Sequence, residues 1–233
     1  MSGFLKNFQP DPDPEMADVR RLWRTTKPLF RDTVVAVAPP YPDYPKLKVS
    51  KRQDPESGPA CPSARDASSD MEVVLYAYSG NGFNSGYQER AWEFLLANAT
   101  GIEIALRRKL YAWHIKQMAQ HREEDLPHVP ELQTYWKKIE KQVPLGDPSA
   151  IEQLFKLVGV GLADSGLDEC GFIAFEFQTG WDRDHGLGVL MHRDRVLAAG
   201  GMGELIYGTD LAAGARTVQS YDMDDADFSL QNS

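Results

Sequence analysis

The segment from Cys170 to Gly201 constrains the fold more than any other part of the chain. It begins with the apolar and aromatic run "CGFIAFEFQT", followed by the charged stretch "GWDRDHG", the run "LGVLMH", the dipeptide "RD" and the run "RVLAAGG". An almost wholly apolar run is typical of a strand with both faces covered. A dipeptide between two such runs has the length of a tight hairpin turn. The segment therefore predicts that the fold ends in a three-stranded β-meander, with a loop after its first strand.

The middle of the chain has the periodicity of helices. From Tyr87 onward, apolar residues recur at spacings of three and four, and the helix-disfavouring residues 98–101 divide this stretch into two helices. "PELQTYWKKIEKQV" predicts a third helix that begins near Pro130. "DPSAIEQLFKLVGV" predicts a fourth, with Asp147 as its cap and Gly159 near its end.

The N-terminal third alternates between strand candidates and segments poor in apolar residues. Residues 1–30 are expected to form a loosely ordered leader, with a short helical turn in "ADVRRLWRTTKPLF". Short strands are predicted at residues 33–37, in "KLKVSKR" and in "MEVVLYAY". Residues 53–70 are rich in Pro, Ser and Asp, cannot bury enough apolar surface to offset their ordering entropy, and predict a mobile loop.

These elements predict a single α+β domain over residues 31–210. Its sheet is expected to be mostly antiparallel, with about four helices inserted between an N-terminal and a C-terminal group of strands. Residues 211–233 are acidic and weakly apolar, and we expect them to be a frayed tail.

Charge and cysteine content limit the classes of partner and compartment. The formal net charge of −9 disfavours nucleic acid and anionic membranes as partners and is compatible with a basic protein partner. No stretch approaches 18 apolar residues, so no membrane span is expected. The two cysteines, Cys61 and Cys170, are widely separated and form neither a disulfide framework nor a zinc motif. A reduced, cytoplasmic protein is therefore expected.

Strand alternation makes Glu176 the most informative residue of the apolar run. It shares a face with Phe172 and Ala174, and a carboxylate among apolar side chains needs a partner. Three nearby basic residues are candidates for that partner: Arg183, His192 and Arg195.

Two interpretations of this region compete. The carboxylates and histidines are suitable zinc ligands or acid–base groups, and the candidates are Glu176, Asp182, Asp184, His185 and His192. Their spacing, however, matches no metalloprotease helix, calcium loop or nucleophile elbow. In the structural alternative, which we favour, Glu176 pairs with an arginine, His185 bonds backbone in a turn, and His192 ends a strand.

The other motifs predict structural roles. His114 and His121 are seven residues apart on one helical face, about 10 Å along the axis, which is too far for one metal ion. With His128, in a loop, they are expected to decorate helix surfaces. "SGNGFNSG" lacks a nucleotide fingerprint and predicts a turn from strand to helix. Cys170 is expected to be buried, and no catalytic nucleophile stands out.

The segment "GFIAFEFQTGWDRDHGLGVLMHRDRVLAAGG" resembles the F-E-F-x-x-x-W-D-x-x-H-G-L-G-V-x-x-H-x-x-R-V signature of an uncharacterised bacterial domain family. "QERAWEFLLAN" is similar to the helical start of that family, and the resemblance covers roughly residues 70–203. This chain departs from the pattern at Ala174, at Asp184 and in "MGEL" after Gly201. The resemblance carries over no catalytic residue. It implies that six residues form a unit: Glu176, Trp181, Asp182, His185, Gly186 and His192.

Some relatives in that family are similar to immunity proteins that neutralise secreted bacterial toxins. The sequence therefore favours a non-enzymatic cytoplasmic binding protein of this type, whose partner is a protein such as a basic toxin. The predicted binding residues are Trp181, Asp182, Asp184 and His185. The predicted structural residues are Glu176, Gly186, Gly188, His192 and Arg195. Neither a metal nor a cofactor is expected.

Two other functions stay open at this point. One is a metal-assisted hydrolase that uses Glu176, His185 and His192. The other is a scaffold whose free sheet edge pairs with another chain. The oligomeric state is not constrained.

Overall fold

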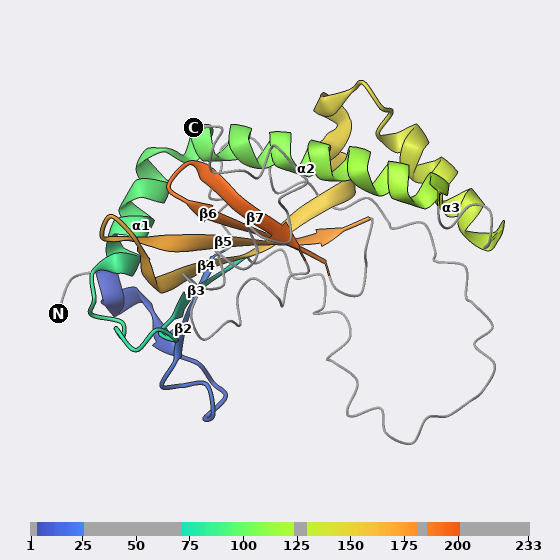
Figure 1. Cartoon of the computed structure of the whole chain (residues 1–233). Helices are drawn as coiled ribbons and strands as arrows, with labels where there is room; N and C mark the ends of the chain where they lie inside the picture. The colour runs from blue at the N-terminus through green and yellow to red at the C-terminus, as the bar shows by residue number, and fades with distance from the viewer. Residues whose placement is uncertain (1–3, 26–70, 124–129, 181–185, 201–233) are drawn as a thin grey trace, which may run out of the picture.

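The computed structural model describes residues 4–25, 71–123, 130–180 and 186–200 (Figure 1). The N-terminal elements are η1 (Phe4–Asn7), β1 (Gln9–Pro10), β2 (Arg20–Thr25) and β3 (Met71–Tyr76). The helices that follow are α1 (Tyr87–Ala97), α2 (Ala99–Glu123), α3 (Pro130–Gln142) and η2 (Pro148–Leu154). The C-terminal strands are β4 (Phe155–Leu167), β5 (Cys170–Thr179), β6 (Leu187–His192) and β7 (Arg195–Gly200). The predictions for residues 33–37, 46–52, 53–70 and 211–233 lie outside the described ranges.

The described strands form one seven-stranded sheet in the order β1 to β7. Strands β3 and β4 are parallel, and every other neighbouring pair is antiparallel. Because parallel neighbours need a crossover connection, the helices between β3 and β4 in the chain return it to the same end of the sheet. The α+β class and the mostly antiparallel sheet are therefore confirmed.

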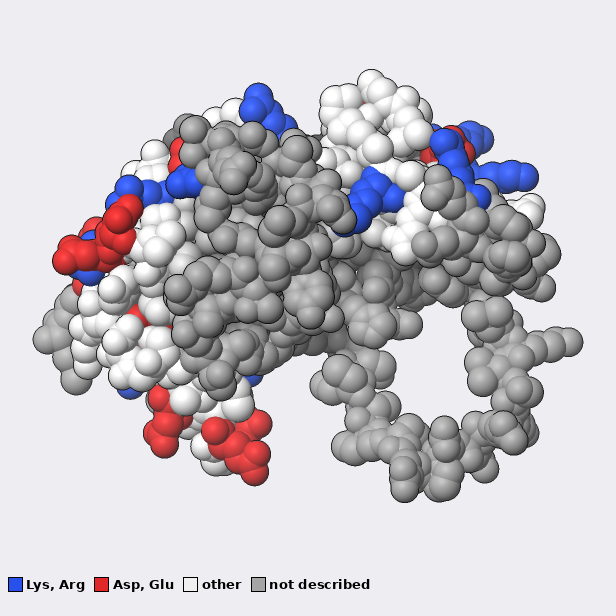
Figure 2. Space-filling model, viewed as in Figure 1, with Lys and Arg blue, Asp and Glu red and all other residues white. Residues whose placement is uncertain are grey.

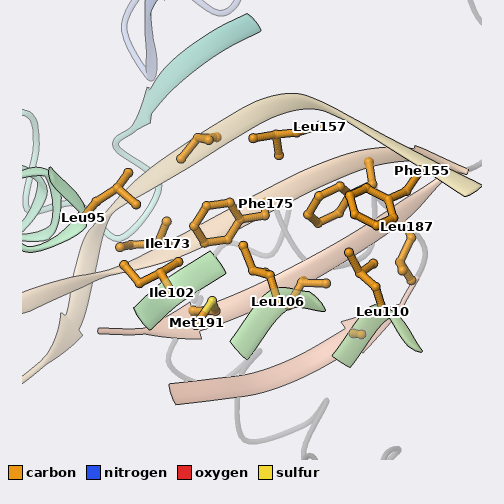
Figure 3. Packing of buried hydrophobic residues seen from close by; sticks show 14 of the residues in the cluster. Leu95, Ile102, Leu106, Leu110, Phe155, Leu157, Ile173, Phe175, Leu187 and Met191 are labelled. Carbon is orange, nitrogen blue, oxygen red and sulfur yellow. The ribbon is translucent and has the colours of Figure 1, made fainter. Parts of the chain in front are cut away.

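Alternation along the strands separates two faces of the sheet. On one face, Ile173, Phe175 and Phe177 of β5 belong to a core cluster that includes residues of all three α-helices. Figure 3 shows Ile102, Leu106 and Leu110 of α2 packed against this face. The second cluster consists only of strand residues, namely Val74, Tyr76, Ala163, Phe172, Ala174, Leu190, Leu197 and Ala198. The predicted division of β5 into two faces is therefore confirmed.

The predicted helix count is wrong. The described residues form three α-helices, and the segment expected to be a fourth is the short 3-10 helix η2 followed by the long strand β4. Strand β4 lies between β3 and β5 and buries side chains on both faces, for example Val160 on the helix face and Ala163 on the other. An apolar run that is buried on both sides has no period that distinguishes it from a buried helix.

The helical turn expected in "ADVRRLWRTTKPLF" is also wrong. Residues 20–25 form β2, which pairs with β3 over its whole length, from Arg20 opposite Tyr76 to Thr25 opposite Met71. Pairing with a neighbouring strand overrides the weak helical preference of the segment. None of the described helices combines the length and the apolar character that a membrane span needs.

The loop "SGNGFNSG" connects β3 to α1, as predicted, and a buried carboxylate holds it. Asp164 is fully buried and accepts hydrogen bonds from the backbone N–H groups of Ser79, at 3.1 Å, and Gly82, at 3.2 Å. The side chain of Gln88 donates to the Tyr76 carbonyl across the same loop, at 3.0 Å. Asp164 is therefore fixed by its loop contacts, a role that was not predicted from the sequence.

His114 corrects a further prediction, because it is buried and not at a helix surface. It belongs to a stripe that repeats every four residues along α2: Ile102, Leu106, Leu110, His114 and Met118, all nearly or fully inaccessible. Its Nε2 lies 2.9 Å from the Val143 carbonyl. The side chain of His121 and the whole of His128 lie outside the described part of the chain.

We expect His114 to make the protein less stable at acidic pH. Burial lowers the pKa of His114 below the ordinary 6.5, and the Val143 carbonyl and the Glu140 carboxylate only partly oppose this. As the pH falls below about 6.5, His114 is therefore protonated in the unfolded chain before it is protonated in the folded protein. The stability that the protein has with a neutral His114 is lost as the pH approaches the lower pKa of the folded state. Urea unfolding of wild type and His114→Gln between pH 7.5 and 5 tests this. The difference in free energy of unfolding between wild type and variant should narrow as the pH falls. A difference that does not change with pH contradicts the lowered pKa of His114.

Candidate functional site

Glu176 lies on the second face of the sheet, in a row of residues paired from strand to strand. The register aligns it with Gly159 on β4 and with Gly188 on β6, and Gly188 in turn with Gly200 on β7. Cα partners on neighbouring strands share a face, so the carboxylate has a glycine on each side. A Cβ atom on Gly159 would lie 3.0 Å from Glu176 Oε2. The side chain is therefore folded over Gly159, in space that a larger residue would fill.

Tyr76 of β3 is the described side chain that reaches this carboxylate. Its hydroxyl donates a long hydrogen bond of 3.5 Å to Glu176 Oε1. A Cβ atom on Gly161 would lie 2.7 Å from Tyr76 Cε2, so the ring lies over Gly161 as the carboxylate lies over Gly159. Tyr76 was not predicted from the sequence. The available signal was the pair of glycines two residues apart in an apolar run, which marks close approach of side chains from neighbouring strands.

The tyrosine continues into a line of charged and aromatic groups toward the N-terminal strands. The Arg20 guanidinium lies 5.6 Å from the centre of the Tyr76 ring. Arg20 Nε lies 3.4 Å from Asp11 Oδ2, and the Tyr78 ring stacks on Tyr76 at 5.6 Å. The second face therefore carries a line of charged and aromatic groups from Asp11, which follows β1, to Glu176 on β5.

His192 ends β6, as the structural alternative predicts, and it is almost fully buried. Its Nε2 donates to the Leu167 carbonyl at 2.9 Å, and its ring meets Phe172 edge to face at 5.9 Å. Burial lowers the pKa of His192, which favours the neutral imidazole. Arg195 pairs with His192 across the β6–β7 hairpin and is exposed.

Glu176 and His192 do not converge. Gly188, the partner of Glu176, is four residues from His192 along β6, about 13 Å in an extended strand. The His192 ring is directed to Leu167 at the β4–β5 turn, whereas the Glu176 carboxylate lies over Gly159. One metal ion therefore cannot take both side chains as ligands. Within the described ranges, no three His, Cys, Asp or Glu side chains group as a metal site requires.

The loop between β5 and β6 contains the predicted binding residues, and all of them lie outside the described residues: Trp181, Asp182, Asp184 and His185. Gly186 is described, and its φ of +65° is in the left-handed region that favours glycine. Gly188 is the Cα partner of Glu176 on β6, so the neighbouring strand places no side chain beside it at this position.

A second candidate site, not predicted from the sequence, lies where α1 meets the N-terminal segment. A cavity of about 390 Å³, here called the aromatic pocket, is lined by Phe4, Phe8, Trp23, Glu89, Trp92, Glu93 and Leu96. Trp23 and Trp92 meet edge to face at 5.4 Å, and Phe8 meets Trp23 at 6.1 Å. The four lining residues of α1 are spaced by three, four and seven, which places them on one helical face.

The two candidate sites differ in their exposure. Glu176 is 8% exposed, which places its carboxylate inside the molecule. Leu96 at the rim of the aromatic pocket is 53% exposed, and Glu93 is also an exposed residue. Of the two sites, the aromatic pocket is therefore the one that a macromolecule can reach directly.

Comparisons with known proteins give a match to a family model. Neither the curated proteins nor the solved structures contain a match to this chain. A family model matches residues 50–206, which include α1, the Glu176 row and β5 to β7. The aromatic pocket combines α1 with residues that precede the matched range. The chain belongs to the family described as Domain of unknown function (DUF6985).

Proposed function

We propose that this chain is a non-enzymatic binding protein of the immunity type, which neutralises a basic bacterial toxin in the cytoplasm by protein–protein contact. The observation that carries the proposal is the concentration of exposed carboxylates and accessible aromatic rings at one end of the molecule. The resemblance of the C-terminal segment to a family with immunity-like relatives supports the same function.

The acidic part of this end is the loop between β1 and β2. Asp13, Glu15 and Asp18 are exposed there, and Figure 2 shows their region as a cluster of red side chains at the lower left. The aromatic pocket adds Glu89 and Glu93 beside Trp23 and Trp92. Carboxylates on a surface attract a basic partner and raise its association rate, while aromatic rings that become buried on binding supply affinity.

The end of the described molecule that carries α3 has a group of exposed lysines. Lys137, Lys138 and Lys141 of α3 are exposed, and Figure 2 shows blue side chains over this helix. Among the described residues, exposed acidic and basic side chains are therefore distributed unevenly, and the field that a diffusing partner meets depends on the end it approaches. A basic partner would be steered to the β1–β2 loop and the aromatic pocket.

The β5–β6 loop stays part of the proposal as a sequence prediction. An indole flanked by Asp182, Asp184 and His185 is the kind of group that anchors protein interfaces, so Trp181 is expected to contact the partner. The competing function, a metal-assisted hydrolase, requires Glu176 and His192 to act at one centre. Their divergence favours the binding function.

The test uses the protein encoded next to this chain in its genome. That protein is expressed in bacteria with and without the chain, and growth and complex formation are measured. We expect the neighbour alone to stop growth, the chain to restore it, and the two to form a 1:1 complex with a Kd of about 1 μM or tighter. A neighbour that is harmless, or whose toxicity the chain does not reduce, contradicts the proposal. Trp181→Ala is expected to weaken the complex about tenfold or more.

A further inference from the structure

The aromatic pocket has the chemistry of a site for an organic cation. Its walls present the rings of Phe4, Phe8, Trp23 and Trp92, and two carboxylates belong to its lining. The face of an aromatic ring carries negative charge and attracts cations, and indole does so best. A carboxylate beside the ring adds a full charge and hydrogen-bond acceptors for the same group.

The two carboxylates of the pocket, Glu89 and Glu93, carry charge that the described residues do not neutralise. Among the residues that the structure describes, no basic side chain forms an ion pair with either of them. They are four residues apart on α1, and like charges at this spacing repel each other and destabilise a helix. The positive end of the helix favours Glu89 in the first turn, but not Glu93 in the next. A cation bound between them would relieve the repulsion.

We propose that the aromatic pocket binds an arginine side chain presented on the surface of a basic protein partner, an inference that rests on the proposed function. Guanidinium is planar, so it stacks on an indole face while its N–H groups donate to carboxylates at its edge. The cavity of about 390 Å³ is near the lower limit for ligand sites, which suits one long side chain better than an extended peptide. The arginine enters beside the exposed Leu96, and its single positive charge between Glu89 and Glu93 offsets their mutual repulsion.

The experiment follows the indole N–H signals of the full-length protein by NMR during titration with a short blocked peptide that contains one arginine. We expect the Trp23 and Trp92 signals to shift with a Kd on the order of 1 mM, while the Trp113 and Trp136 signals stay in place. The matched peptide with citrulline has the same shape without the charge, and should bind about tenfold more weakly or not at all. Tetramethylammonium tests a free quaternary ammonium ion as the source of the cation.

Two pairs of substitutions separate the pocket from a general effect of charge. Glu89→Gln with Glu93→Gln should weaken binding of the arginine peptide by about tenfold. Asp168→Asn with Asp194→Asn removes the same charge from the β4–β5 and β6–β7 turns, and should change the Kd by less than about twofold. Trp92→Leu keeps apolar bulk without an indole face and should abolish the shift of Trp23. Thermal unfolding checks that each variant is folded.

Three outcomes would overturn the inference. They are equal binding of the arginine and citrulline peptides, equal losses in the two double variants, and tighter binding of tetramethylammonium than of the arginine peptide. The titration needs no toxin, so its result is independent of the growth test. A pocket that binds the arginine peptide in a protein that rescues no growth refutes only the proposed function. Rescue of growth without peptide binding refutes only the pocket.

Discussion

Replacing Phe175 with alanine is expected to lower the free energy of unfolding by about 3–5 kcal/mol, because the ring is fully buried at the centre of the core. Phe175 lies on β5 between Val160 of β4 and Val189 of β6, on the face that α2 covers. Figure 3 shows its ring among side chains from the strands and from α2. Alanine would leave a cavity that paired strands on both sides cannot close.

Urea unfolding followed by circular dichroism measures the change, and Leu167→Ala is the matched control. Leu167 is at the end of β4 and is 46% exposed, so its truncation should cost less than about 1 kcal/mol. Because natural domains are stable by only about 5–15 kcal/mol, the Phe175 variant should unfold at a much lower urea concentration. Equal losses in the two variants would contradict the position of the ring.

The face of the sheet on which Glu176 lies could be predicted from the sequence, because side-chain direction in a strand alternates with a period of two. This rule needs only the strand itself, so Phe172 and Phe175 fall on opposite faces as expected. Strand β4 could not be predicted in the same way, because it follows the helical pattern of η2 without a break, and a run buried on both faces has no period of its own to mark where a strand begins.

The contacts of the two candidate sites required the pairing of distant strands. Tyr76 and Glu176 are separated by 100 residues, and they meet only because β4 inserts between β3 and β5. Likewise, Trp23 meets Trp92 through the packing of β2 beside α1. Local periodicity contains no information on which strands become neighbours. For His114, in contrast, the signal was present, since it continues the stripe of Leu106 and Leu110 at a spacing of four.

Replacing Gly166 with alanine is expected to destabilise the protein by at least about 3 kcal/mol, although it adds only one methyl group. A Cβ atom at this position would overlap the carbonyl oxygen of Cys170 and would lie 2.7 Å from the Cα of Gly171. Both are backbone atoms of the partner strand, so no side-chain rotation relieves the overlap. The ends of β4 and β5 must therefore separate. The two-residue turn that joins them resists this, because the φ angles of 47° at Asp168 and 60° at Glu169 fix the hairpin.

The same substitution at Gly101 should have the opposite sign. Gly101 is in α2, and a Cβ atom added to it would have nothing within 4 Å, so alanine should stabilise the protein by about 0.5–1 kcal/mol through its better helix propensity. Urea unfolding compares the free energies of unfolding of the two variants. A nuclear magnetic resonance titration of His192 shows whether the end of the β4–β5 hairpin has opened. Opening the hairpin lets water reach the His192 ring, and relief of the burial that lowers its pKa outweighs loss of the Leu167 hydrogen bond that raises it, so the pKa should rise toward 6.5. If Gly166→Ala is as stable as wild type and the pKa of His192 is unchanged, then β4 and β5 do not approach each other at this end. The buried position of His192 would then need another cause, because its contact with the Leu167 carbonyl depends on that approach.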